Sequence, residues 1–125
     1  MLHVYITGQI KNKKKIEQFS IDCLEHFFKG RVKRDVDIDI RITKSHTDNS
    51  HGGCYGDHQH IVLEIAKGLN ENNTYYSFDY KEIIVTIAHE LVHAKQHIRR
   101  ERIDVLDAES EAYELEYMLY DKYWD

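Results

Sequence analysis

Residues 80–97 read YKEIIVTIAHELVHAKQH, and this stretch decides the fold. Its central part, IIVTIAHELVHA, is apolar almost all round, which is typical of a helix buried in a core. The same stretch nevertheless carries three histidines and a glutamate within nine positions. Charged and titratable groups are rarely buried without a partner, and a metal ion is one such partner. We therefore expect a buried helix over about 78–102 that carries a metal site.

Two of the histidines have the spacing of a zinc-ligand pair. His89 and His93 are four residues apart, so a helix presents both rings on one face, about 6 Å apart along its axis. Both can then reach one zinc ion with bonds of about 2 Å. Glu90 lies beside the first ring, where it can act as a general base without being a ligand. The alternative, a helix with solvent-facing histidines and a surface glutamate, fits poorly with the apolar residues at 91 and 92.

The third histidine of the helix, His97, is not expected to be a ligand. It lies about 12 Å from His89 along the axis, too far for both to bind one ion from an unbroken helix. We interpret His97 as a residue at the rim of the site, a residue that supports a ligand, or a surface residue. The third ligand must then come from another element.

The first half of the chain predicts strands around one helix. Residues 2–9 (LHVYITGQ) and 36–44 (VDIDIRITK) alternate with period two and predict strands, and residues 60–69 (HIVLEIAKGL) predict a third. Residues 16–30 (IEQFSIDCLEHFFKG) have apolar side chains at helical spacing, with Gly30 as a stop signal. The histidine-rich segment 45–59 is predicted to be a polar, glycine-rich loop above a cleft. Its spacing fits no standard zinc signature.

The last element is predicted to be a helix that ends near Lys122 and begins after a cap at Asp104 or Asp107. NENN, at 70–73, predicts a turn. The order strand, helix, strand, strand, helix, helix predicts one α+β domain over residues 1–125.

Composition excludes several classes of protein. The 125 residues are 42% hydrophobic and 31% charged, which is ordinary for a soluble globular chain. No apolar run approaches the roughly 20 residues that span a bilayer, and no signal peptide is evident. The net charge of −5 argues against nucleic acid as a partner. Cys23 and Cys54 form no disulfide framework, so we expect a reducing cytoplasm. Oligomeric state is not predicted.

The final helix offers two candidates for the third ligand, Glu109 and Glu111, in DAESEAYELE (107–116). A simple antiparallel hairpin of helices would bring residue 111 nearer the level of His93. IAHELVHAKQ followed by ESEAY resembles the gluzincin metallopeptidases, and is particularly similar to small minigluzincin-like and phage-type members. The resemblance implies Glu109 as the ligand, because the family's pattern then places a small residue at Ala112 and a polar, supporting one at Tyr113.

The resemblance also implies a fold and an activity. The fold would be a zincin-like single domain: a small mixed sheet with a helix across it, a buried HExxH helix and a C-terminal glutamate helix. The activity would be zinc-dependent hydrolysis of a peptide or protein substrate, with Glu90 as general base and acid. Candidate oxyanion donors are Tyr113, His97 and Tyr55. The strand at 60–67 would be the edge strand that binds an extended peptide.

Two other functions fit the sequence. The first is a zinc-binding regulatory or interaction protein with a zincin-like fold and no peptidase activity. The second is a helical interaction module with accidental histidines, in which the aromatic side of the last helix packs on a partner. That side carries Tyr113, Tyr117, Tyr120, Tyr123 and Trp124.

Overall fold

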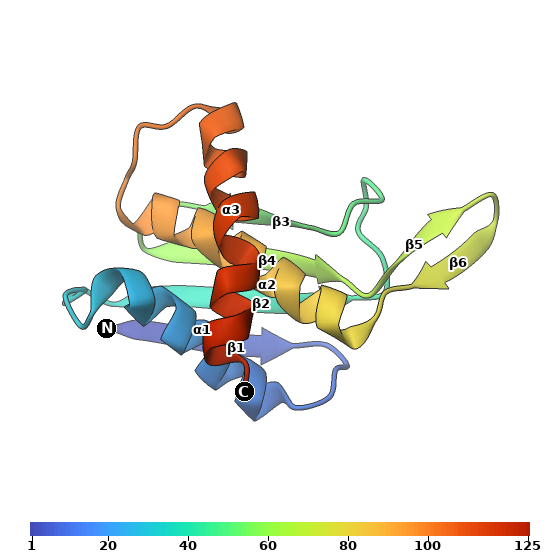
Figure 1. Ribbon diagram of the computed structural model, residues 1–125, viewed down its shortest axis with the longest axis horizontal. Helices are drawn as coiled ribbons and strands as arrows, with labels where there is room; N and C mark the ends of the chain where they lie inside the picture. The colour runs from blue at the N-terminus through green and yellow to red at the C-terminus, as the bar shows by residue number, and fades with distance from the viewer.

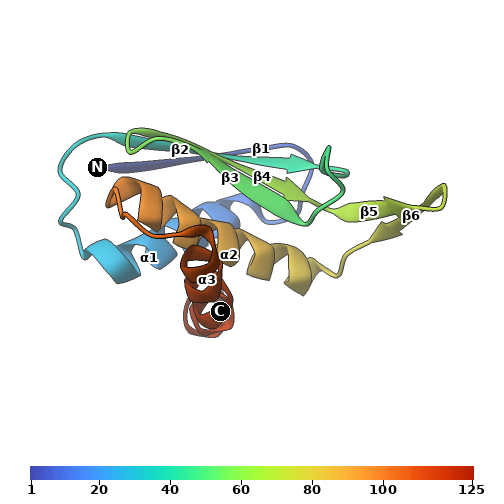
Figure 2. The same ribbon diagram turned by 90° about the horizontal axis from the view of Figure 1, so that it is seen from above.

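Alternating apolar and polar residues in two neighbouring strands set the layers of the fold. In β2 (Val36–Thr43) and β4 (His60–Ala66), isoleucine and leucine side chains are buried on one face, whereas the side chains on the other face are mostly polar. The computed structural model, which describes residues 1–125, places all three helices on the side of the apolar face, the first two against the sheet and the third across them (Figures 1 and 2). The predicted α+β class and the mixed sheet are confirmed.

The main sheet has the strand order β1-β2-β4-β3. β1 (Leu2–Thr7), β2 and β4 run parallel, and α1 (Lys13–Phe28) connects β1 to β2 across the apolar face. β3 (Gly52–Gly56) pairs antiparallel with β4 and forms one edge. β4, the strand predicted at 60–67, lies between β2 and β3. The prediction that this strand forms an edge of the sheet is therefore wrong.

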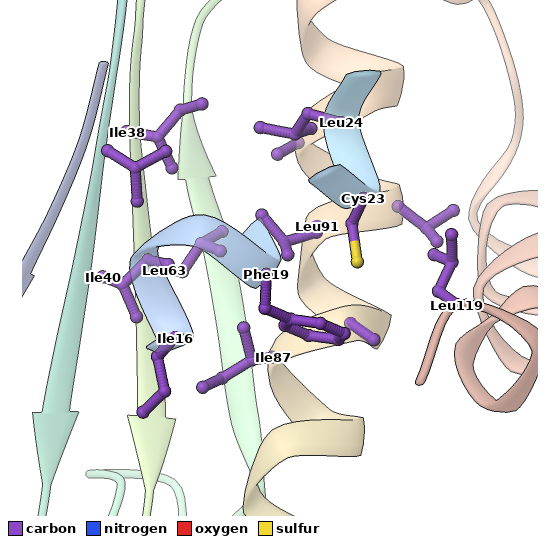
Figure 3. Close-up of a cluster of buried hydrophobic side chains, with 14 of the residues drawn as sticks. Ile16, Phe19, Cys23, Leu24, Ile38, Ile40, Leu63, Ile87, Leu91 and Leu119 are labelled. Carbon is purple, nitrogen blue, oxygen red and sulfur yellow. The ribbon is translucent and has the colours of Figure 1, made fainter. Parts of the chain in front are cut away.

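The hydrophobic core lies between the sheet and the first two helices (Figure 3). Phe19 of α1 also packs edge-on against Trp124, with ring centroids 5.4 Å apart, so the core reaches the C-terminal end of the chain. Its almost fully buried side chains include Ile16, Phe19, Leu24, Ile38, Ile40, Leu63, Ile87, Leu91 and Leu119.

The two later helices have well-defined ends. α2 (Tyr80–Ile98) ends four residues before the predicted 102, because Arg100 adopts a left-handed backbone with φ of 54°. α3 (Val105–Tyr123) begins after Asp104, whose carboxylate accepts a hydrogen bond of 2.9 Å from the Asp107 backbone N–H. Of the two predicted caps, Asp104 is therefore the one that is used. None of the three helices combines the length and the apolar character needed to cross a bilayer.

Two strand regions differ from the prediction. β3 lies inside the predicted loop 45–59, and its sequence GGCYG has no alternating pattern, so the strand depends on pairing with β4. The predicted strand 60–69 ends at Ala66, and a hairpin of β5 (Gly68–Glu71) and β6 (Thr74–Ser77) follows. The turn expected at NENN is present at its tip. Asn72 and Asn73 both have positive φ there, as tight hairpin turns require.

Candidate metal centre

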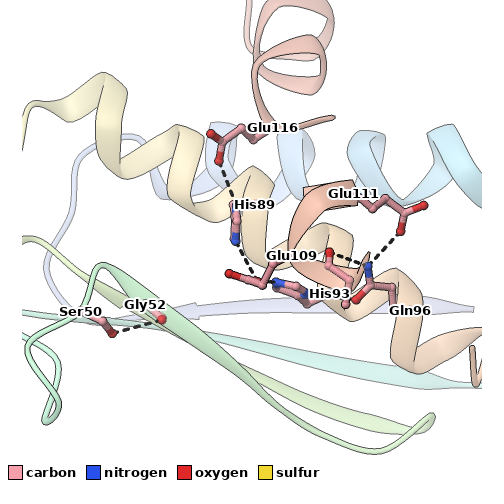
Figure 4. Close-up of polar contacts among 9 residues, drawn as sticks. Ser50, Gly52, His89, His93, Gln96, Glu109, Glu111 and Glu116 are labelled. Atoms are coloured by element: carbon pink, nitrogen blue, oxygen red, sulfur yellow. Dashed lines mark hydrogen bonds and ion pairs between the residues drawn. The ribbon is translucent and has the colours of Figure 1, made fainter. Parts of the chain in front are cut away.

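The crossing of α3 over α2 builds the candidate site. α2 supplies His89, Glu90 and His93, and α3 brings Glu109 over the two histidines (Figure 4). Ala112, one turn after Glu109, is fully buried, so a small side chain stands beside Glu109 where α3 meets the rest of the fold. Position 112, where a small residue is expected, is thus packed against neighbouring side chains.

One oxygen of Glu109 faces both imidazoles. His89 Nε2 lies 3.3 Å from Glu109 Oε1, and His93 Nε2 contacts the same oxygen. The three ligand atoms all lie within 4.8 Å of one another. Two imidazole nitrogens and a carboxylate oxygen are ligands that zinc accepts at about 2.0–2.2 Å. This donor set and its spacing fit one zinc ion.

The other ring nitrogen of each histidine is held by a hydrogen bond. His89 Nδ1 donates to Glu116 Oε2 at 3.0 Å, and His93 Nδ1 donates to Gln96 Oε1 at 2.8 Å. These contacts fix both rings with Nε2 directed at Glu109, the arrangement that orients histidine ligands in metal sites. Tyr113, expected as a supporting residue, instead packs its ring against that of His89 at a centroid distance of 4.7 Å.

Replacing Glu116 by glutamine tests whether this contact supports a metal ligand. We expect Glu116→Gln to weaken zinc binding by about tenfold or more, because an amide is a poorer acceptor for His89 Nδ1–H and can present its donor instead. Competition against a chromophoric chelator measures the dissociation constant. Glu114→Gln on the exposed side of α3 is the matched control. Equal affinities in both variants would contradict a supporting role for Glu116.

Glu111, the alternative ligand, is engaged elsewhere. Its Oε1 accepts hydrogen bonds from Lys95 Nζ at 2.6 Å and from Gln96 Nε2 at 2.9 Å. Partial burial raises the pKa of Glu111, but these bonds and the charge of Lys95 outweigh burial and leave the pKa below its ordinary value. Glu111 is therefore an anion that holds Gln96, while Glu109 faces the histidines.

Glu90 is buried beside the site without a partner. It is 6% exposed, and its carboxylate takes part in no hydrogen bond or ion pair. Because no fully buried side-chain oxygen of the chain lacks a partner, this carboxylate is open to the cleft that it lines. Burial raises the pKa of Glu90 above its ordinary value, while the neighbouring His89 and His93 act in the opposite direction. A buried carboxylate with a raised pKa next to two convergent histidines is typical of a general base.

The other candidate residues line the walls of the cleft. His97 is half-buried, and burial lowers its pKa. The Tyr55 hydroxyl lies 3.0 Å from Nε2 of His46, a buried histidine that also contacts Asp48 and Glu64. Tyr55 is therefore held on the wall by its neighbours. Burial and the nearby Glu90 raise the pKa of the Cys54 thiol, which keeps it protonated.

The cleft continues on both sides of Glu90 and Glu109. A cavity of about 670 Å³ extends along the C-terminal half of α2, and one of about 510 Å³ extends along its N-terminal half. Gly52 of β3 lines both. A Cβ there would lie 2.6 Å from the carbonyl oxygen of Glu64 in β4, so only glycine fits at this position, and 3.3 Å from Thr86 Cγ2 of α2.

Sequence reasoning missed Glu116, Gln96 and His46. Gln96 follows His93, the residue it supports, by three positions, and Glu116 follows Glu109 by seven, so Gln96 shares a helix face with His93 and Glu116 shares one with Glu109. That spacing was a usable signal. His46 gave none, because its contacts depend on the fold of a loop.

No protein family, curated protein sequence or solved structure matches the chain. The functional argument therefore depends on the residues of the site and their geometry.

Proposed function

We propose that the chain is a zinc-dependent peptide-bond hydrolase with a zincin-like fold of the gluzincin type. One observation carries the proposal: the ligand atoms of His89, His93 and Glu109 converge within 4.8 Å beside the buried, unpartnered Glu90. The chemistry that a bound zinc ion supplies is Lewis acidity toward water and toward a carbonyl oxygen.

The chain's own residues would transfer the proton and hold the histidine rings in place. Glu90 takes a proton from the attacking water as its oxygen bonds to the carbonyl carbon. It then gives this proton to the amine nitrogen as the C–N bond breaks. Glu116 and Gln96 hold the two histidine rings in place. Which group stabilises the oxyanion stays open among Tyr113, His97 and Tyr55.

The edge strand β3 offers a place for an extended substrate. It pairs with β4 on one side only, and its residues Gly52 to Tyr55 line the cleft beside Glu90. A peptide added along this edge would gain main-chain hydrogen bonds and bring its carbonyl groups past the site. β3 thus takes the role that the sequence had suggested for the strand at 60–67. Cys23 and Cys54 are both free thiols, which supports a cytoplasmic setting as part of the proposal.

Zinc content after single substitutions tests the ligand set. We expect about one zinc per wild-type chain. Glu109→Ala should lose it, because a ligand is removed. Glu111→Ala should keep it at saturating zinc, with weaker affinity, because Glu111 acts through Gln96. Elemental analysis of dialysed protein gives the stoichiometry, and circular dichroism confirms folding. Loss of zinc only in Glu111→Ala would exchange the two roles, and a folded wild type that takes up no zinc would overturn the proposal.

Activity separates the proposal from its main alternative. A zinc-loaded wild type that cleaves no member of a mixed peptide library would favour a zinc-binding regulatory or interaction protein.

A further inference from the structure

The smaller cavity, beside the N-terminal half of α2, has a distinct chemical character. We call it the glutamate pocket, because its walls include four glutamates: Glu82, Glu90, Glu109 and Glu116. No lysine or arginine lines it. Its volume of about 510 Å³ is that of a typical ligand pocket, which spans roughly 300–1,000 Å³.

The negative charge of this pocket exceeds what the proposed zinc would offset. A divalent ion balances two of the four carboxylates, and the histidines that bind it are neutral. Glu82 forms no ion pair. Its neighbour Lys81 points elsewhere, with Nζ 5.2 Å from the centre of the Tyr120 ring. The buried and unpartnered Glu90 also faces this pocket. The pocket thus retains unbalanced negative charge with the metal in place.

Two aromatic side chains complete the walls of the glutamate pocket. Tyr113 is 63% exposed and Tyr117 is 53% exposed, although both are large side chains that a helix could have buried. Ring faces attract lysine and arginine side chains, and their apolar surface suits the methylene stem of such a side chain. Carboxylates and tyrosine rings together favour a long cation.

The other end of the cleft differs. Its cavity is lined by Arg100 and by the apolar side chains of Ile103 and Val105, as well as by acidic residues. The two sides of Glu90 therefore present different surfaces to a peptide, and only the glutamate pocket is without lysine and arginine.

We propose that the glutamate pocket binds a lysine or arginine side chain next to the scissile bond of the substrate. This inference rests on the proposed peptidase function, and it names the substrate class as peptides with a basic residue at that position. Glu82 is the specificity-determining residue, because it is the one glutamate of the pocket that neither contacts the histidines nor stands next to one in the sequence.

Cleavage-site mapping tests the inference. The zinc-loaded full chain is incubated with a mixed peptide library, and mass spectrometry identifies the new termini. We expect lysine and arginine at one of the two flanking positions, preferred over glutamate by about tenfold or more, and a loss of this preference in Glu82→Lys. Glu114→Gln, which removes a carboxylate outside the pocket, should keep it. Cleavage without a basic preference would overturn the inference and leave the peptidase proposal standing. Absence of any cleavage would overturn both.

A binding experiment gives a second readout that does not need activity. The metal-free chain, labelled with ¹⁵N, is titrated with Nα-acetyl-lysine methylamide and with the uncharged, nearly isosteric norleucine compound. We expect the lysine compound to shift the amides of Thr86, Tyr113 and Tyr117 in the wild type, but not in Glu82→Lys. Equal shifts with both compounds, or shifts at another surface only, would contradict the proposed pocket.

Discussion

Glu90→Gln is expected to lower the rate of peptide cleavage by about 10²- to 10⁴-fold while the chain still binds zinc. The glutamine has nearly the same shape and fills the same buried position, but it cannot accept a proton from water. Because Glu90 forms no hydrogen bond with a histidine, its replacement should leave the proposed ligands and their supporting contacts in place. Steady-state kinetics on a fluorogenic peptide, together with zinc analysis of the same sample, measures both effects.

The same substitution should stabilise the metal-free chain at neutral pH. Burial raises the pKa of Glu90 in the folded state, so ionisation of this carboxyl opposes folding. Its contribution to stability is present at pH values below the ordinary pKa and is lost as the pH rises through the folded-state pKa. Glutamine stays neutral, so the advantage of the variant should grow as the pH rises from the ordinary pKa of a glutamate through the folded-state pKa of Glu90.

Urea unfolding of metal-free protein at several pH values measures this difference, with Glu114→Gln as the control. A variant that keeps full activity would show that Glu90 is not the general base. A variant that is less stable than the wild type at every pH would show that the folded chain satisfies the Glu90 carboxylate.

Helical spacing made half of the candidate site predictable. The relative positions of His89, Glu90 and His93 follow from the geometry of one helix, and the apolar residues around them indicate burial. The alternation in residues 36–44 likewise indicates a strand with one wet face, and β2 has that pattern of burial. These features are local, so neighbouring residues determine them.

The contacts between α2 and α3 could not be predicted from the sequence in the same way. Whether Glu109 or Glu111 meets the histidines depends on how α3 crosses α2. The two alternatives differ by only two positions in the sequence. In the structure Lys95 and Gln96 bind Glu111, and this leaves Glu109 above the histidines. Nothing in the sequence around Lys95 indicates that its ammonium group is buried against Glu101 and Glu111.

The edge strand was missed for a related reason. Gly52 and Gly53 have low strand propensity, and β3 exists because β4 pairs with it and because glycine at position 52 permits a close approach to the Glu64 carbonyl of β4. Pairing with the next strand of a short hairpin thus converts an apparent loop into a wall of the cleft.

Lys95→Met is expected to lower the free energy of unfolding by about 3 kcal/mol. Lys95 is 2% exposed, and its ammonium group donates to Glu101 at 3.0 Å and to Glu111 at 2.6 Å. Methionine preserves much of the apolar stem but leaves both carboxylates without their cation. The expected loss is at the low end of the range of about 3–5 kcal/mol for breaking a buried pair, because the side chains of Glu101 and Glu111 are 24% and 33% exposed.

The loss should also reach the metal site. Gln96 donates to Glu111 and accepts from His93 Nδ1, so Lys95 holds the position of His93, a proposed ligand, through two intervening side chains. With Lys95 gone, Glu111 is drawn toward solvent and Gln96 loses an acceptor. We expect zinc affinity to fall by about tenfold, the lower limit for loss of a group that supports a ligand. Urea unfolding and chelator competition on the same preparation measure the two effects.

The double variant Lys95→Met, Glu111→Gln separates the charge of Glu111 from its role as an acceptor. The glutamine introduced by Glu111→Gln is neutral and needs no cation, yet its carbonyl oxygen can still accept from Gln96. Stability and zinc affinity should therefore both recover in part relative to Lys95→Met. Recovery of stability alone would show that the charge network stabilises the helix crossing without orienting His93. A single variant as stable as the wild type would show that the ion pairs of Lys95 make no net contribution to the fold.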